Sequence, residues 1–261
     1  MRSRLVETSQ TDGPKSSALL AVLRTEARLF TREPGAMFWI LVFPTLIMSI
    51  LGLIPAFREP DPGLGGLRVI DLYVPVAILV AMIVAGIQTM PAVLASYRER
   101  GILRRLAVTP ARPADLLIAQ IVTHAVTVLA SVVLALLVGR IAFAVEFPAR
   151  PWGYGLAVLV TLAAALSLGA MLAAVSPSVR IAQTLGTIVF FPMLFCAGVW
   201  LPVQTMPELL QRIVELTPFG AAAQLLDQTA AGGGLDLGGM AIVIGWTVVL
   251  SGIAIRWFRW Q

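Results

Sequence analysis

Hydrophobic residues occur along this chain in long runs that are separated by shorter polar segments. Six of these runs approach or exceed the ~20 residues that an α-helix needs to cross a bilayer core. The runs do not alternate polar and apolar positions with a period of two, which argues against the strands of a membrane β-barrel. The pattern therefore predicts an all-α polytopic membrane protein with six transmembrane helices. The predicted spans cover about residues 36–57, 72–95, 116–139, 152–175, 181–202 and 237–255.

The N-terminal part of the chain is more polar than the rest. Residues 1–17 contain no apolar segment and predict a disordered cytoplasmic tail. In residues 18–33 apolar positions recur with helical spacing beside several arginines, so this segment is too short and too charged to span. We expect a helix that lies in the membrane interface, with its arginines reaching toward lipid headgroups. Residues 18–261 are then expected to form a single transmembrane domain.

A moderately apolar segment separates the fifth run from the sixth. Residues 207–216 have the spacing of an amphipathic helix, and residues 221–226 predict a second short helix after a break at Pro218-Phe219-Gly220. Two interpretations are open for this pair. The helices either re-enter the outer leaflet of the membrane or form an ordinary extracellular cap.

Prolines lie inside three of the predicted spans, at Pro44, Pro75, Pro91 and Pro192. A membrane helix tolerates proline when neighbouring groups satisfy the carbonyl that loses its hydrogen bond. We therefore expect kinks at these positions.

The distribution of charge sets the orientation of the spans. Only 13% of the residues are charged and 58% are hydrophobic, whereas a soluble domain has about 25% charged residues. With six spans, 14 of the 19 Lys and Arg residues fall on the side of the N-terminus. The positive-inside rule then places both termini and the loop at 97–115 in the cytoplasm. The net charge of +5 thus reflects topology among membrane lipids, and it does not indicate a nucleic-acid partner.

The loop between the second and third spans is densely charged. Residues 97–110 read YRERGILRRLAVTP. On a helical projection the apolar residues occupy one side and the arginines the other. The residue before Pro110 is disfavoured in the α region, which ends the helix. Two interpretations are open: a two-faced helix that receives force from a soluble partner, or a positive loop that only fixes topology.

The sequence offers few groups for catalysis. It has one histidine, one cysteine and one lysine, so a disulfide, a cysteine metal cluster or a Ser/His/Asp relay is not expected. Lys15 lacks the upstream glycines of a phosphate-binding loop. No Asp or Glu lies inside the six runs, although an ion-driven carrier usually needs such groups near the midplane. We therefore expect that the chain is not an enzyme and that energy for transport enters from elsewhere.

Four residues are candidates for a substrate path because they place polar or aromatic groups within or near apolar runs. They are Gln88, His124, Phe191 and Phe195. A second interpretation is open for each of them. The polar pair can instead form hydrogen bonds between helices, and the aromatic pair can pack in the core or contact lipid.

Two motifs at matching positions give the chain a resemblance to a known family. The loop Arg98–Pro110 is similar to a run E-x-G-T-L-E-R-L-x-x-T-P. A second set, Gly198–Pro202, Met206-Pro207 and Leu216-Thr217-Pro218, is similar to a run G-x-x-F-P … L-P … L-x-P after the fifth span. Over nearly its whole length the chain resembles the membrane permeases of type-2 ATP-binding-cassette (ABC) exporters. Ile102 and Arg104 depart from the pattern, which has a threonine and an acid there.

The resemblance implies a half-transporter with no cofactor of its own. Two permeases pair in the bacterial cell membrane, here as an expected homodimer, and each docks on a separate ATPase subunit that binds ATP and Mg²⁺. The loop over 98–109 would be the coupling helix, and spans one and five would supply the pairing face. The implied contacts with the ATPase are Glu99, Gly101, Leu103, Arg104, Arg105, Leu106 and Thr109.

The implied activity is export of a hydrophobic or amphipathic, drug-like or antibiotic-like compound. The absence of large soluble insertions resembles the daunorubicin-resistance-type subgroup. Two alternatives stay open: export of a lipid or polysaccharide precursor, and a membrane assembly or sensor subunit with the same fold. The lack of acids within the spans argues against an ATPase-independent carrier.

Overall fold

The computed structural model describes residues 15–64, 66–102 and 113–257. Within these residues six helices are long and apolar enough to cross a membrane. The described residues form no β-strand, although an isolated bridge joins Pro60 and Arg68. The prediction of an all-α polytopic membrane protein is confirmed. The expected disordered tail lies mostly outside the described residues, and the first helix begins at Lys15.

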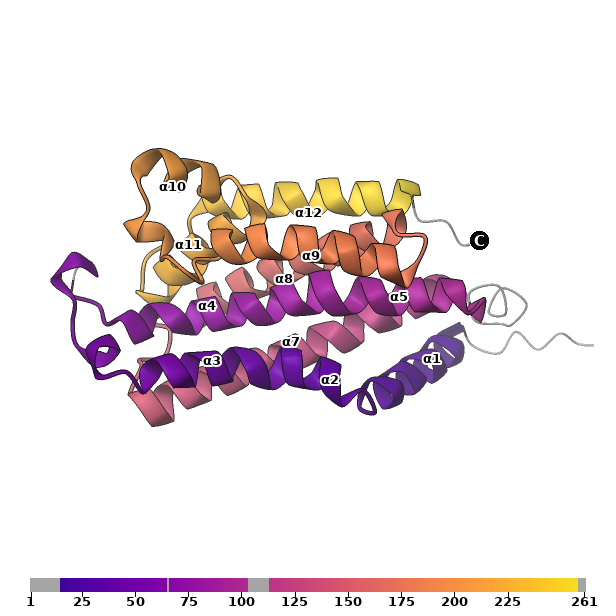
Figure 1. The fold of residues 1–261 in the computed structure, drawn as a ribbon, viewed down its shortest axis with the longest axis horizontal. Coiled ribbons are helices and arrows are strands. Elements are labelled where there is room, and N and C mark those ends of the chain that lie inside the picture. Colours follow the sequence, from indigo (N-terminus) through magenta and orange to yellow (C-terminus); the bar gives the residue numbers. More distant parts are fainter. Residues whose placement is uncertain (1–14, 65, 103–112, 258–261) are drawn as a thin grey trace, which may run out of the picture.

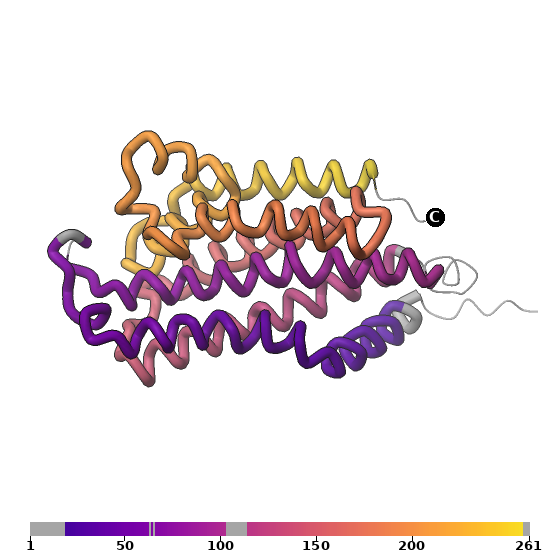
Figure 2. The backbone as a smooth tube through the Cα atoms, viewed as in Figure 1, coloured from indigo at the N-terminus to yellow at the C-terminus, as the bar shows by residue number. Residues whose placement is uncertain are grey.

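The six spans run along the long axis of the molecule (Figures 1 and 2). The first two are each built from three consecutive elements. The first comprises α2 (Pro34–Met37), the π-helix η1 (Phe38–Val42) and α3 (Phe43–Gly52); the second comprises α4 (Val69–Ile83), the π-helix η4 (Val84–Thr89) and α5 (Met90–Glu99). The other four are α7 (Pro113–Phe143), α8 (Pro151–Val175), α9 (Val179–Cys196) and α12 (Leu237–Trp257).

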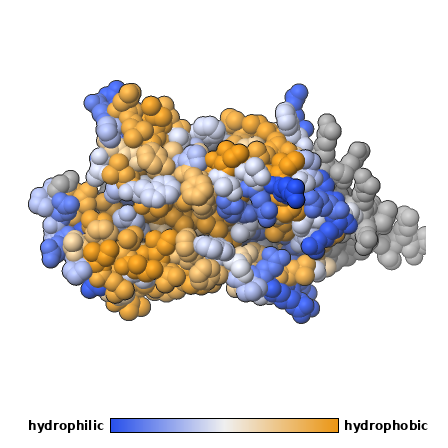
Figure 3. All heavy atoms as spheres, viewed as in Figure 1, coloured by the Kyte–Doolittle hydropathy of each residue, from blue (hydrophilic) through white to orange (hydrophobic). Residues whose placement is uncertain are grey.

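Shorter helices lie at the two ends of this bundle (Figure 1). The helix α1 (Lys15–Phe30) packs against α7 at the end where α5 and α12 terminate. The opposite end carries α10 (Glu208–Glu215), α11 (Pro218–Ala230) and three short 3₁₀ segments. These are η2 (Pro55–Arg58), η3 (Pro62–Leu64) and η5 (Val203–Thr205). Hydrophilic residues gather toward both ends of the face shown in Figure 3, and hydrophobic residues cover much of the surface between them.

The second span forms the centre of the bundle. Of its most apolar window 83% is buried, against 22% in α9 and in α12. The outer spans therefore leave large apolar side chains exposed, including Ile188 and Phe191 on α9 and Val248 on α12. In a membrane such surfaces contact lipid or a second subunit, because the acyl chains are as apolar as these side chains.

Glycines allow the second span to approach α8 closely. A Cβ atom built on Gly169 of α8 would lie 2.2 Å from the Gly86 carbonyl oxygen, and one on Gly86 would lie 2.3 Å from the Ala165 oxygen. A third contact is made to α9, where a Cβ on Gly186 would lie 2.9 Å from the Ile87 oxygen. Small residues permit such close backbone approach between membrane helices. The crossing at Gly86 and Gly169 is therefore specified by the absence of side chains.

Two of the intramembrane prolines coincide with π-helical turns. Pro44 and Pro91 are each the second residue of an α-helix that follows a π segment. Proline has no N–H and its ring clashes with the carbonyl of residue i−4, and a wider preceding turn relieves this clash. Pro75 and Pro192 differ, because α4 and α9 continue through them.

Several helix boundaries differ from the sequence-based expectation by three to six residues, and two of them have a clear local cause. The fifth apolar run was expected to stay helical to residue 202, but α9 ends at Cys196 because Gly198 adopts a left-handed φ of +81°. The N–H of Val199 donates to the Leu194 oxygen and that of Gly198 to the Phe195 oxygen, which is a Schellman motif. In α11, Pro218 starts the helix, because it occupies the first turn and the Thr217 hydroxyl accepts a hydrogen bond from the Gly220 N–H at 3.1 Å.

Candidate functional site

The last two residues of α5 hold the turn that joins α8 to α9. The Arg98 guanidinium donates hydrogen bonds to the carbonyl oxygens of Ala173, at 3.2 Å, and Ser176. The Glu99 carboxylate accepts a hydrogen bond from the Val179 N–H at 2.9 Å. A cation thus lies at the C-terminus of α8 and an anion at the N-terminus of α9, and both positions are favoured by the helix dipoles. We call this set of contacts the Arg98–Glu99 bridge.

The bridge is formed by the first two residues of the predicted coupling helix over 98–109, and in the structure these residues end α5 instead. Of the seven predicted ATPase contacts, Glu99 and Gly101 lie within the described residues. Gly101 follows the end of α5 with a left-handed φ of +66°, which a glycine adopts without strain. The other five, Leu103, Arg104, Arg105, Leu106 and Thr109, lie outside the described residues. Contact of any of them with an ATPase stays a prediction.

Arg98 was not among the residues singled out from the sequence. The helical projection assigned it to the polar face of the loop, together with the other arginines. A usable signal is its position in the last turn of a span, where an arginine can bond the last carbonyl groups of a helix. Identifying that neighbour requires the tertiary structure, because Ser176 is 78 residues away in the sequence.

A buried carboxyl group fastens α1 to the same end of the bundle. The side chain of Glu26 is only 6% exposed, and its carboxylate accepts hydrogen bonds from the Tyr97 hydroxyl at 2.7 Å and from the Gln120 amide. Burial raises the pKa of Glu26, while these two hydrogen bonds oppose the shift. The expected interfacial helix is therefore tied through one acid to α5 and to α7.

Replacing Glu26 by alanine is expected to destabilise the protein by about 1–3 kcal/mol, because the buried Gln120 amide and the half-buried Tyr97 hydroxyl lose their acceptor. The measurement is thermal unfolding of the purified protein in detergent. Glu33→Ala is the matched control: Glu33 is exposed at the same end and makes no side-chain cap, so a change within about 0.5 kcal/mol is expected. Equal losses in the two variants would contradict the role given to Glu26.

The four candidate substrate-path residues occupy different surroundings. His124 is fully buried; its Nδ1 lies 2.9 Å from the Gln120 carbonyl oxygen, and its ring meets the edge of Phe30. Gln88 lies in η4, Phe191 is exposed on α9, and Phe195 is half-buried. His124 therefore belongs to the contact between α7 and α1. A role for the four in guiding substrate stays a prediction.

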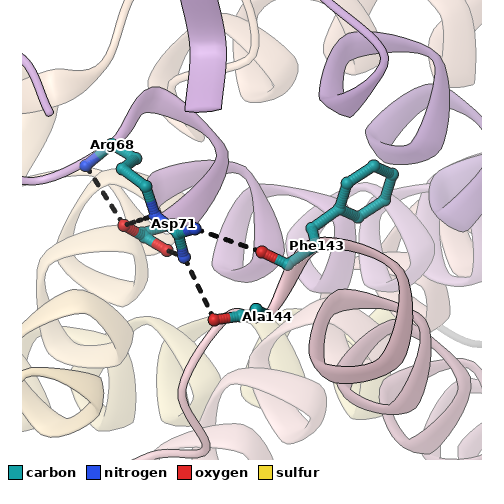
Figure 4. A network of polar contacts seen from close by, with 4 residues as sticks. All are labelled: Arg68, Asp71, Phe143 and Ala144. Atoms are coloured by element: carbon teal, nitrogen blue, oxygen red, sulfur yellow. Dashed lines mark hydrogen bonds and ion pairs between the residues drawn. The ribbon is translucent and has the colours of Figure 1, made fainter. Parts of the chain in front are cut away.

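At the opposite end of the bundle, Arg68 joins the start of α4 to the end of α7 (Figure 4). Its guanidinium pairs with the Asp71 carboxylate at 2.6 Å and 3.0 Å. The same group donates to the carbonyl oxygens of Phe143 at 3.1 Å and Ala144 at 3.3 Å. Ala144 has a φ of +53°, which is uncommon for a residue with a Cβ atom. Arg68 thus binds carbonyl groups that would otherwise lack partners where α7 ends.

The described residues contain no cluster of three or more His, Cys, Asp or Glu placed to hold a metal ion. The arrangement is instead a helical bundle whose second span makes charge-assisted contacts at both ends and a glycine crossing in the middle.

Comparison with known proteins agrees with a role in transport. A search of curated proteins gave no match to the chain. Residues 17–229 match the family described as ABC-2 type transporter. Because this match covers most of the sequence, the chain belongs to the ABC-2 type transporter membrane family.

Proposed function

We propose that this permease exports a hydrophobic or amphipathic, drug-like compound, powered by two copies of a separate ATPase subunit. It would work as a homodimer in the bacterial cell membrane, with both termini in the cytoplasm, and would resemble the daunorubicin-resistance-type subgroup. ATP and Mg²⁺ would be bound by the ATPase. The exposed apolar surface of α9, which includes Ile188 and Phe191, is suited to pairing or to lipid contact.

The Arg98–Glu99 bridge is the observation that carries this proposal. An ATPase that moves the loop between α5 and α7 would pull directly on the end of α5. Through Arg98 and Glu99 that movement would reach the ends of α8 and α9, which are bonded to α5 through the turn at 176–178. Nucleotide binding would then bias a two-state arrangement of the spans, and the permease itself needs no catalytic residue.

The distribution of basic residues supports the orientation. The described arginines at the ends of α1 and α12 and around the turn at 176–178 lie at the end of the bundle where α5 ends and α7 begins (Figure 1). With six spans, the sequence assigns 14 of its 19 basic residues to this side. Positively charged segments are retained in the cytoplasm, and that is where an ATPase would reach the loop.

Reconstitution tests the proposal. The permease is co-expressed with the ATPase encoded beside its gene, and ATP-dependent uptake of fluorescent amphipathic drugs is measured in inverted membrane vesicles. We expect uptake to require both proteins and to disappear when the lysine of the ATPase phosphate-binding loop is replaced. A drug-susceptibility panel on a strain lacking the permease then narrows the substrate. Uptake that persists with the inactive ATPase would contradict ATP-driven export.

A further inference from the structure

A cavity of about 740 Å³ lies at the end of the bundle opposite α1 and the C-terminal end of α12. It is enclosed by the start of α4, the end of α7 and the following loop, the start of α8, η5 and the end of α11. Its volume falls in the range of small-molecule sites. None of the four candidate substrate-path residues lines it.

One buried hydroxyl group in the wall of this cavity has no partner. Tyr154 of α8 is only 4% exposed, and its hydroxyl makes no hydrogen bond within the described part of the chain. Buried tyrosine hydroxyls usually find a hydrogen-bond partner, because leaving one unpaired costs free energy. A ligand in the cavity that donates or accepts a hydrogen bond at Tyr154 would remove that cost.

The charges that line the cavity leave an excess of negative charge. Asp71 and Arg68 neutralise each other in the ion pair of Figure 4, and Glu146 stands on the loop after α7. Asp227 of α11 is half-buried, and one of its oxygens accepts a hydrogen bond from the Gln204 amide. Within the described residues its other oxygen accepts no hydrogen bond, and no cation besides Arg68 lines the cavity.

The remaining walls are largely apolar, with Leu67 before α4, Leu72 and Val74 within it, and Leu136 on α7. We propose that this cavity binds an amphipathic primary amine, with the ammonium group between the Asp227 carboxylate and the Tyr154 hydroxyl and the apolar body against these side chains. An ammonium group supplies three donors, which suits a carboxylate oxygen and an unpaired hydroxyl. Binding here requires neither the ATPase nor export. An experiment can therefore contradict this site without contradicting the proposed transport function, and the reverse.

Dansylcadaverine is a suitable probe because it joins a fluorescent apolar ring system to a primary amine. Binding is measured by fluorescence titration of the purified full-length permease in detergent, without an ATPase. The matched control is the same compound with its amine acetylated, which has the same apolar body and no charge. We expect the acetylated compound to bind at least tenfold more weakly. Equal affinities would overturn the proposal and would indicate an apolar cavity without selectivity for amines.

Variants separate the two polar contacts. Asp227→Asn keeps the shape of the side chain and removes its charge, and we expect about tenfold weaker binding of dansylcadaverine. Tyr154→Phe removes only the hydroxyl, and we expect a loss of about threefold. Glu208→Gln is the control, since Glu208 is an exposed acid at the same end, outside the cavity. A loss in the control equal to that in Asp227→Asn would assign the effect to general surface charge and contradict the site.

The pH dependence provides a test in the unmodified protein. Burial raises the pKa of the Asp227 carboxyl to about 7, although the hydrogen bond from Gln204 by itself lowers the pKa. The groups that face this carboxyl across the cavity are Arg68 and Asp71 at the start of α4, Glu146 on the loop and Tyr154 on α8. A primary alkylamine stays protonated from pH 6 to pH 8, so a change in affinity reports the protein.

We expect dansylcadaverine to bind more tightly at pH 8, where Asp227 is ionised, than at pH 6, where it is mostly protonated. For one carboxyl with a pKa of about 7 the difference can approach about tenfold. Asp227→Asn should abolish it. Affinity in the parent protein that is equal at the two pH values would overturn the assignment of the ammonium contact to Asp227.

Discussion

Replacing Gly169 by alanine is expected to remove most of the folded permease, although the change adds a single methyl group. The new carbon would lie 2.2 Å from the Gly86 carbonyl oxygen, which is backbone and has no rotamer through which to move. The second span, which is the most buried in the bundle, and α8 would have to separate along their crossing. Overpacking of a tight core costs about 1–3 kcal/mol and occasionally more, and contact with a rigid backbone should fall at the upper end.

The control for this prediction lies on the same helix. Gly155 of α8 is exposed, and a Cβ atom built there meets nothing within 4 Å. Gly155→Ala should therefore leave stability unchanged or slightly improved, because alanine is the better helix former. Fluorescence-detected size-exclusion after heating compares the two variants. If Gly155→Ala and Gly169→Ala melt at the same temperature, the crossing is not as tight as described.

Reversing the charge of Glu99 is expected to uncouple ATP hydrolysis from export. In Glu99→Lys the Val179 N–H loses its acceptor, and a cation lies at the positive end of the α9 dipole. A charge at a helix terminus is worth about 0.3–1 kcal/mol, so its reversal and the lost hydrogen bond together cost about 1–2 kcal/mol. We expect export per ATP hydrolysed to fall about tenfold, measured in proteoliposomes with the partner ATPase.

Glu99→Gln distinguishes a contact to α9 from a charge contact to the ATPase. Glutamine keeps an oxygen that can accept from Val179, so the Arg98–Glu99 bridge should persist and coupling should stay near that of the parent protein. Arg100→Gln is the control, since Arg100 is an exposed neighbour of the bridge. If Glu99→Gln uncouples as strongly as Glu99→Lys, the negative charge itself is required, and a direct ion pair with the ATPase becomes the better explanation.

The membrane fold was predictable from the sequence because the information is local. Each apolar run is long enough to identify a span without reference to its neighbours, and the six helices are found where the runs lie. The end of α9 was missed because the run stays apolar through Val199, whereas Gly198 changes the backbone direction before hydropathy changes. Pro218 was interpreted as a break only, although it also begins α11.

The polar contacts of the candidate site could not be predicted in the same way. Glu26 looks like any polar residue of an amphipathic helix, and its partners Tyr97 and Gln120 are 71 and 94 residues away. The same holds for Asp227, whose surroundings are formed by helices from four parts of the chain. Such residues are recognised by burial and by the donors that surround them, and both are properties of the tertiary structure.

Both ends of the second span are attached to the C-terminal end of a neighbouring helix: the antiparallel α7 at one end and the parallel α8 at the other. Arg68 binds the final carbonyl groups of α7 at one end, and Arg98 binds those of α8 at the other. A helical rod of 31 residues is about 45 Å long, so these anchors lie on opposite sides of a bilayer. A tilt imposed on one end must therefore carry both neighbours with it or first break charge-assisted hydrogen bonds worth about 1.5–3 kcal/mol each. Mechanical work done at one membrane surface would thereby reach the other without passing through any loop.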